Sequence, residues 1–136
     1  MSAFEEDDLR RENAELKTRV ERLERVASVV EASSEAIVST APDGTLLYWN
    51  AAAQRLYGFT AGDAIGRNCL ELVPFDCLTE HQRALKRALS GVRVVLETRR
   101  RRKDGGEVRV ELRYTQLADP DGTPLGVSIV AHAIGE

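Results

Sequence analysis

The first third of the chain carries its apolar residues on a seven-residue repeat. Leucine recurs every seventh residue from Leu9, and polar residues fill most of the positions between. In chain order, the repeat consists of Leu9, Asn13, Leu16, Val20, Leu23, Ala27 and Val30. No glycine or proline occurs before Pro42. This pattern predicts one amphipathic helix that runs to about residue 33, with leucine at the d positions of a coiled coil.

Charges beside the repeat favour a parallel pair of such helices. In this register Glu12 would face Lys17 of a second copy, and Arg19 would face Glu24. Asn13 lies at an a position, where two asparagines satisfy each other only in one register. We therefore predict a parallel homodimer through residues 9–30. The alternatives are a single amphipathic helix that packs on its own domain and a solvated spacer.

After residue 34 the period of the pattern shortens to that of β-strands. Two β-compatible runs, 35–40 and 45–49, flank Pro42-Asp43-Gly44, which is typical of a hairpin turn. Asn50 and Gly58 predict the start and end of a short helix over 51–57. A longer helix is predicted over 79–89, with Gly91 as its stop.

Three further strands are predicted at 92–102, 107–117 and 125–134, separated by turns rich in glycine and aspartate. In the second of these strands, apolar residues from Val108 to Tyr114 alternate with charged ones, so one face of the sheet is dry and the other wet. Two strands, a helical insert and three strands predict an α+β domain over 34–136, with the helix of residues 1–33 in front of it.

Composition narrows the classes of function. A chain of 136 residues with a net charge of −3 has the size of one domain and no overall attraction to nucleic acid. It has no apolar run of membrane-spanning length. Cys69 and Cys77 form neither a zinc motif nor a disulfide framework, which fits a cytoplasmic protein. We expect the basic run 99–103 to be a solvated strand neutralised by nearby glutamates.

Several segments of the second part resemble a known family in their order and spacing. They are Asp43-Gly44-Thr45-Leu46-Leu47-Tyr48-Trp49-Asn50-Ala51-Ala52-Ala53, Leu56-Tyr57-Gly58-Phe59, Ile65-Gly66-Arg67 and Lys103-Asp104-Gly105. Over roughly residues 28–134 the chain resembles a PAS domain. The resemblance implies a five-stranded antiparallel sheet with helices over one face, preceded by a dimerising helix. Many PAS domains end in an Asp-Ile-Thr coupling motif, but here Ala133-Ile134-Gly135 stands at that place.

The resemblance also implies a ligand pocket between helices and sheet. We expect this pocket to be lined by Trp49, Leu56, Tyr57, Ile65, Leu72, Leu85, Val110 and Ile129. Cys69 lies where the flavin-binding light-oxygen-voltage subclass has its adduct-forming cysteine. The arginine and glutamine that follow it in that subclass are replaced by Leu70-Glu71, and no asparagine occurs after Asn68, so flavin is disfavoured.

Histidine is the second candidate for a cofactor ligand. His81 lies near the place where some PAS domains bind haem, although the surrounding run 79–83 has the pattern of a solvated helix start. His132 is expected at a surface or strand edge. No catalytic motif and no metal cluster is present in the sequence. The sequence therefore predicts a sensor or interaction module that is not an enzyme and that signals to an effector such as a kinase or cyclase. A haem-based gas or redox sensor and a ligand-free structural dimeriser remain alternatives.

Overall fold

The computed structural model describes residues 2–135, and within them the chain forms two compact units, residues 2–31 and residues 32–135. The sequence predicts a domain boundary between residues 33 and 34. That the two parts are separate domains stays a prediction.

The first unit consists of the long helix α1 (Ala3–Ala32), which confirms the predicted helix. Glu5 and Glu6 lie in its first turn, where negative charge is favourable beside the helix dipole. None of its residues is buried in the single chain. Most of the apolar repeat is therefore open to solvent, with Leu16 56% and Leu23 69% exposed.

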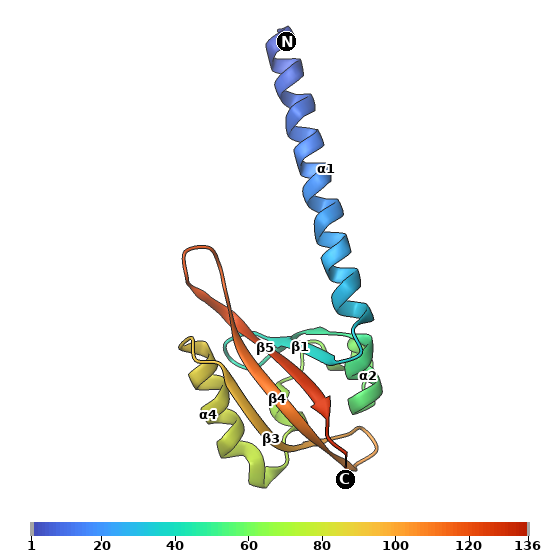
Figure 1. Cartoon of the computed structure of the whole chain (residues 1–136), viewed down its shortest axis with the longest axis vertical. Helices are drawn as coiled ribbons and strands as arrows, with labels where there is room; N and C mark the ends of the chain where they lie inside the picture. Colours follow the sequence, from blue (N-terminus) through green and yellow to red (C-terminus); the bar gives the residue numbers. More distant parts are fainter. Residues whose placement is uncertain (1, 136) are drawn as a thin grey trace. The chain divides into compact units, whose positions relative to one another are not determined.

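The second unit is built on one antiparallel sheet of five strands in the order β2-β1-β5-β4-β3 (Figure 1). The strands are β1 (Ala36–Thr40), β2 (Leu46–Trp49), β3 (Val94–Arg101), β4 (Glu107–Ala118) and β5 (Pro124–Ala133). All four neighbouring pairs are antiparallel. The predicted α+β fold with a five-stranded antiparallel sheet is confirmed. The strands β2 and β3 form the two edges.

Local signals in the sequence explain how the first hairpin and the next helix form. Gly44 adopts a φ of 91° in the turn between β1 and β2, a conformation that only glycine adopts without strain. The side chain of Asn50 accepts a hydrogen bond from the N–H of Ala53 and so starts α2 (Ala51–Tyr57). Gly58 closes α2 in the left-handed conformation. Both predicted caps are confirmed.

The connection between the two groups of strands is mostly short helices. It contains α3 (Ala61–Ala64), two 3-10 turns, η1 (Cys69–Leu72) and η2 (Phe75–Cys77), and the longer α4 (Leu78–Leu89). The sequence predicted α4 to within one residue. Helix α2 packs against β1, whereas α4 packs against β4 and β5.

The core lies between these helices and one face of the sheet. On β4 the side chains of Val110, Leu112 and Tyr114 are buried, and the residues between them are more exposed. Their antiparallel partners on β5 continue the same face: Leu112 pairs with Ala131, and Tyr114 pairs with Ile129. The predicted dry face is therefore the one that the helices cover.

Among the described residues, 2–135, no helix combines the length and apolar character that crossing a bilayer would require.

Candidate functional site

The residues expected to line a ligand pocket are distributed through the core and at its margin. Five of the eight are buried, and Leu56 and Leu85 are partly buried against the core. The five buried residues are Trp49, Tyr57, Leu72, Val110 and Ile129. Ile65 lies at the surface with 45% of its area exposed. The predicted pocket residues therefore lie in the core and at its margin, and their role in binding a ligand stays a prediction.

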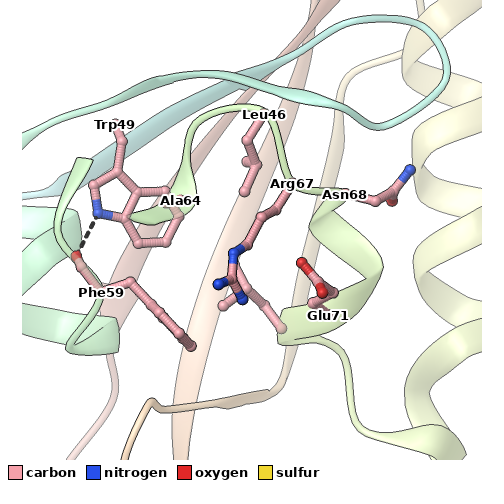
Figure 2. Close-up of a pocket in the computed structure, with 8 residues that line it drawn as sticks. Leu46, Trp49, Phe59, Ala64, Arg67, Asn68 and Glu71 are labelled. Atoms are coloured by element: carbon pink, nitrogen blue, oxygen red, sulfur yellow. Dashed lines mark hydrogen bonds between the residues drawn. The ribbon is translucent and has the colours of Figure 1, made fainter. Parts of the chain in front are cut away.

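A small pocket is present beside Trp49 (Figure 2). Its volume is about 20 Å³, and it is lined by Leu46, Trp49, Phe59, Ala64, Arg67, Asn68, Glu71 and Leu72. The indole Nε1 of Trp49 donates a 2.8 Å hydrogen bond to the carbonyl oxygen of Phe59, which holds the ring at the pocket wall. A space of this size holds roughly one water molecule.

The neighbouring cysteine is a core residue. Cys69 is 4% exposed at the start of η1, and burial raises the pKa of its thiol to about 11. Asn68 accepts a hydrogen bond from the N–H of Leu70 and donates one to the carbonyl oxygen of Asp43, so it ties η1 to the β1–β2 turn. The segment thus has a structural explanation that needs no flavin.

The strongest concentration of buried polar chemistry lies between α4 and the sheet. His81 from α4, Arg100 from β3 and Tyr114 from β4 are 1%, 2% and 0% exposed. The hydroxyl of Tyr114 lies 2.8 Å from Nδ1 of His81 and accepts a 2.8 Å hydrogen bond from Nη2 of Arg100. We call these three residues the core polar cluster. Tyr114 is its centre.

The hydrogen bonds of the core polar cluster favour one assignment of its protons. Because the Tyr114 oxygen accepts from Arg100, its own proton is free to point at Nδ1 of His81. His81 is then the neutral tautomer that carries its proton on Nε2. That Nε2 is buried and has no hydrogen-bond partner among residues 2–135. One buried donor is therefore left unsatisfied, an arrangement that is uncommon in folded proteins.

Electrostatics agrees with a neutral imidazole. Burial, helped by the charge on Arg100, lowers the pKa of His81 to about 4. Burial likewise raises the pKa of Tyr114 to about 12, against a smaller lowering by Arg100. Near neutral pH the phenol and the imidazole are both uncharged, and Arg100 carries the only charge within the cluster.

The sequence predictions for this region were wrong at two positions. His81 was expected in a solvated helix start, but it points into the core from the first turns of α4. Arg100 was expected in a solvated basic strand, but it is buried. Strand alternation carried the signal for Arg100, since pairing across the 103–106 turn sets it opposite Val108 on the dry face. Tyr114 was placed on that face, but its polar role was not predicted.

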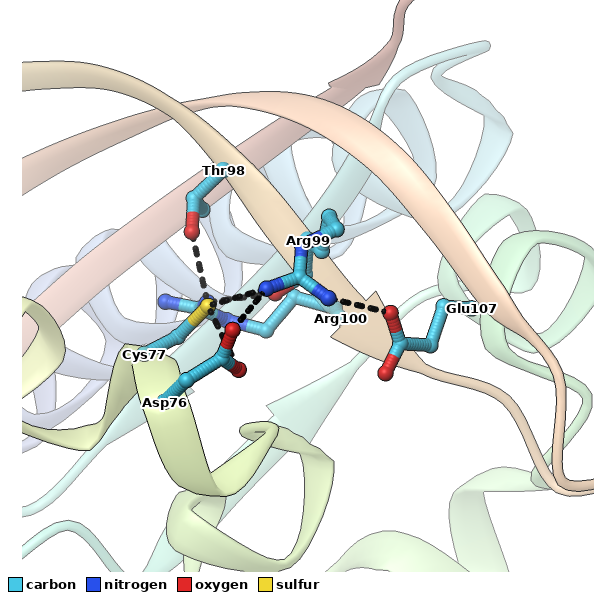
Figure 3. Close-up of polar contacts among 6 residues, drawn as sticks. All are labelled: Asp76, Cys77, Thr98, Arg99, Arg100 and Glu107. Carbon is cyan, nitrogen blue, oxygen red and sulfur yellow. Dashed lines mark hydrogen bonds and ion pairs between the residues drawn. The ribbon is translucent and has the colours of Figure 1, made fainter.

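The outward-facing part of the basic run behaves as expected. Arg99 forms ion pairs with Asp76 and with Glu107, the latter at 2.7 Å (Figure 3). Its Nη2 also lies 3.7 Å from the sulfur of Cys77. The hydrogen bond from Arg99 lowers the pKa of Asp76, and the two carboxylates raise the pKa of Arg99. Since Arg99 and both carboxylates are 40% or more exposed, these pairs contribute little stability.

Haem binding by His81 stays a prediction. Nδ1 of His81 is held by Tyr114 and Nε2 is unpartnered, which is the pattern of an iron-binding histidine. The guanidinium of Arg100 lies in the same cluster, and the small pocket beside Trp49 shares no lining residue with the cluster. His132 is exposed on β5. Within residues 2–135 no group of three His, Cys, Asp or Glu side chains could hold a metal ion.

Comparison with solved structures shows the same fold in other proteins. A PAS domain from Colwellia psychrerythraea matches with a TM-score of 0.77 and 22% identity, over 82% of this chain and 96% of that one. The PAS domain of an HTR-like protein from Haloarcula marismortui matches with a TM-score of 0.67 and 19% identity, over 84% and 98%. A light-oxygen-voltage domain matches with a TM-score of 0.69 and 21% identity, over 82% and 86%.

The sequence itself matches a protein family as well. Residues 30–136 match the family described as PAS fold, which is well over half of the chain. The match covers the sheet, its helices and the core polar cluster. The chain therefore belongs to the PAS fold family, whose members are sensory and signalling modules.

Proposed function

We propose that this chain is a homodimeric signal-input module. Two copies pair through a parallel coiled coil of α1, and a change that a ligand or partner causes in the PAS unit passes along the coil to an effector. The observation that carries the proposal is the heptad stripe of α1, whose apolar residues are exposed in the single chain. An exposed stripe of this length in an otherwise polar helix is typical of a helix that pairs with another copy.

The polar positions of α1 support a parallel rather than an antiparallel pair. Asn13 lies within the apolar seam, where it favours one register. Glu12 with Lys17, and Arg19 with Glu24, form attractive pairs between copies when the helices are parallel and in register. A coiled coil with two nearly equal packings can transmit a small rotation or shift of register, provided that the packings differ by a few kcal/mol.

The proposal assigns sensing and protein interaction, rather than catalysis, to the globular unit. Family membership supports this assignment, since PAS domains are generally sensory. We propose a cytoplasmic location because both cysteines, Cys69 and Cys77, are free thiols. The effector would be a further domain or a partner protein, for example a kinase or a cyclase.

Light scattering on the intact chain tests the dimer. One chain has a mass of 15.0 kDa, and we expect twice that value at micromolar concentration. Leu16→Glu introduces a charge at a d position and should halve the observed mass. Ala14→Glu introduces the same charge at an exposed b position and should leave the dimer intact. A monomeric intact chain, or two variants that behave alike, would refute the pairing.

A further inference from the structure

The guanidinium of Arg100 is buried and has no carboxylate partner among residues 2–135. Within residues 2–135 it donates to the hydroxyl of Tyr114. It also donates to the carbonyl oxygen of Arg99 at 2.7 Å and to the hydroxyl of Thr98 at 3.5 Å (Figure 3). All three acceptors are neutral. A fully buried cation is normally paired with an anion, because neutral dipoles alone compensate poorly for its lost hydration.

In the part of the chain that the structure describes, no neighbouring group supplies the missing negative charge. The charge of Arg100 reaches Tyr57, Cys69 and Tyr114, but burial raises the pKa of each, so all three stay protonated near neutral pH. The carboxylate of Glu80 affects the pKa of Tyr114. It lies exposed on α4, and its effect on that pKa is small. The core polar cluster therefore retains one net positive charge.

The groups of the core polar cluster that lack hydrogen-bond partners are N–H donors. The neutral tautomer of His81 presents an Nε2–H that no atom of residues 2–135 accepts. Arg100 has five N–H donors and no acceptor. A cluster with a net positive charge and spare donors is complementary to an anion with at least two acceptor oxygens.

We propose that Arg100, Tyr114 and His81 form a binding site for the carboxylate group of a small organic acid. This inference rests on the sensory function proposed above and names the class of signal that the PAS unit would bind. A carboxylate matches the single charge of Arg100 and the planar, bidentate geometry of a guanidinium.

Packing restricts the size of the acid and the direction of its approach. Trp49 and Tyr57, whose ring centroids are 5.3 Å apart, belong to the same core, and the pocket beside Trp49 adds only about 20 Å³. An open groove of about 460 Å³ lies between α4 and β3 and is lined in part by Val94 and Leu96. These residues share a strand face with Arg100, although Arg100 itself does not line the groove. We expect acids of a few carbon atoms.

Thermal unfolding of the intact chain provides the first test. The probes are sodium acetate, propionate and benzoate at about 50 mM, each compared with sodium chloride at equal ionic strength. At least one carboxylate should raise the melting temperature by roughly 3 °C or more over chloride. Arg100→Met should abolish that shift. Arg101→Met is the matched control because Arg101 is the exposed neighbour on the same strand, and it should keep the shift.

The same variants test the buried charge without added acid. If Arg100 is uncompensated, Arg100→Met should melt in chloride at the same temperature as the wild type or higher, since an apolar side chain of similar volume replaces a buried cation. A melting temperature lowered well below that of Arg101→Met would show that the chain itself satisfies Arg100. That result, or an acid-induced shift that survives in Arg100→Met, would overturn the proposal.

A measurement on the wild type avoids any effect of mutation on folding. In nitrogen-15 histidine spectra, the Nε2 resonance of His81 should move when a binding acid is added, whereas that of the exposed His132 should not. If none of the three acids changes the His81 resonance or the melting temperature, the carboxylate site does not exist. Light scattering reports dimerisation separately, so a monomer that binds acid would refute the coiled coil and retain the site.

Discussion

The leading helix and the PAS unit depart from ordinary burial in opposite directions. Helix α1 keeps apolar side chains in water, with Leu23 69% exposed. The PAS unit keeps a cation out of water, with Arg100 2% exposed and no carboxylate partner within residues 2–135. Each departure costs free energy that a binding partner would recover. The two partners proposed above are a second copy for α1 and an anion for the core.

The largest expected effect separates the stability of the PAS unit from that of the helix. Gly126 on β5 lies so close to β1 that an added Cβ would overlap the carbonyl oxygen of Thr40. Gly126→Ala should therefore break the β1–β5 pairing and lower the free energy of unfolding of the PAS unit by about 3 kcal/mol or more. Urea denaturation followed by Trp49 fluorescence measures this, since Trp49 is buried in that unit.

Gly62→Ala is the matched control for this substitution. The Cβ added at Gly62 would meet nothing nearer than the Thr60 hydroxyl at 3.9 Å. We expect a change within about 1 kcal/mol, in either direction. Equal effects of the two substitutions would contradict the close approach of β5 to β1.

A smaller effect should appear in the pH dependence of stability. The pKa of His81 is about 4 in the fold and about 6.5 when unfolded. Between these values the unfolded chain binds more protons, so the free energy of unfolding should fall as pH drops from 6.5 to 4. The contribution of His81 is at most about 1.4 kcal/mol per pH unit.

Paired variants isolate this contribution from that of the carboxylates. His81→Gln should flatten the slope of the free energy of unfolding against pH between pH 6.5 and 4. His132→Gln, at an exposed position on β5, should leave the slope of the wild type unchanged. The groups of the core polar cluster beside His81 are the hydroxyl of Tyr114 and the guanidinium of Arg100, and the pKa of Tyr114, about 12, lies far above this range. Parallel curves for all three proteins would show that His81 is not buried as described.

The parts of the fold that were predicted depend on local chemistry. Asn50 and Gly58 bound α2 by hydrogen bonds within a few residues, and Gly44 makes its turn because of its own backbone freedom. Such signals involve only neighbouring residues, so they can be identified in the sequence without knowledge of the tertiary structure. The same holds for the heptad stripe of α1, which is a pattern along one helix.

The core polar cluster could not be predicted in full because it depends on contacts between distant segments. His81 and Tyr114 are 33 residues apart in sequence, and Arg100 meets Tyr114 only through the pairing of β3 with β4. The basic run also hid a buried residue among exposed ones, since composition does not distinguish Arg100 from Arg99 and Arg101. The alternation of inward-facing and outward-facing side chains along β3 does distinguish Arg100 from its two neighbours.

The proposed pocket illustrates the remaining difficulty. Resemblance placed eight residues around a common ligand, and five of them are buried in the core whereas Ile65 lies at the surface. How much volume remains in a core depends on the combined sizes of all its side chains, which no motif encodes.

Distance measurement between spin labels tests the parallel coiled coil most directly. Ala14→Cys and Ser28→Cys, made separately in a chain whose two native cysteines are replaced by alanine, each place one label at an exposed b position of α1. A parallel, in-register pair should give one distance of about 20–30 Å at both positions, since the two helices lie side by side along their length. Absence of dipolar coupling would contradict the account, and so would distances well above about 30 Å at both positions, because a head-to-tail pair centred near residue 21 adds roughly 21 Å of axial separation at each site.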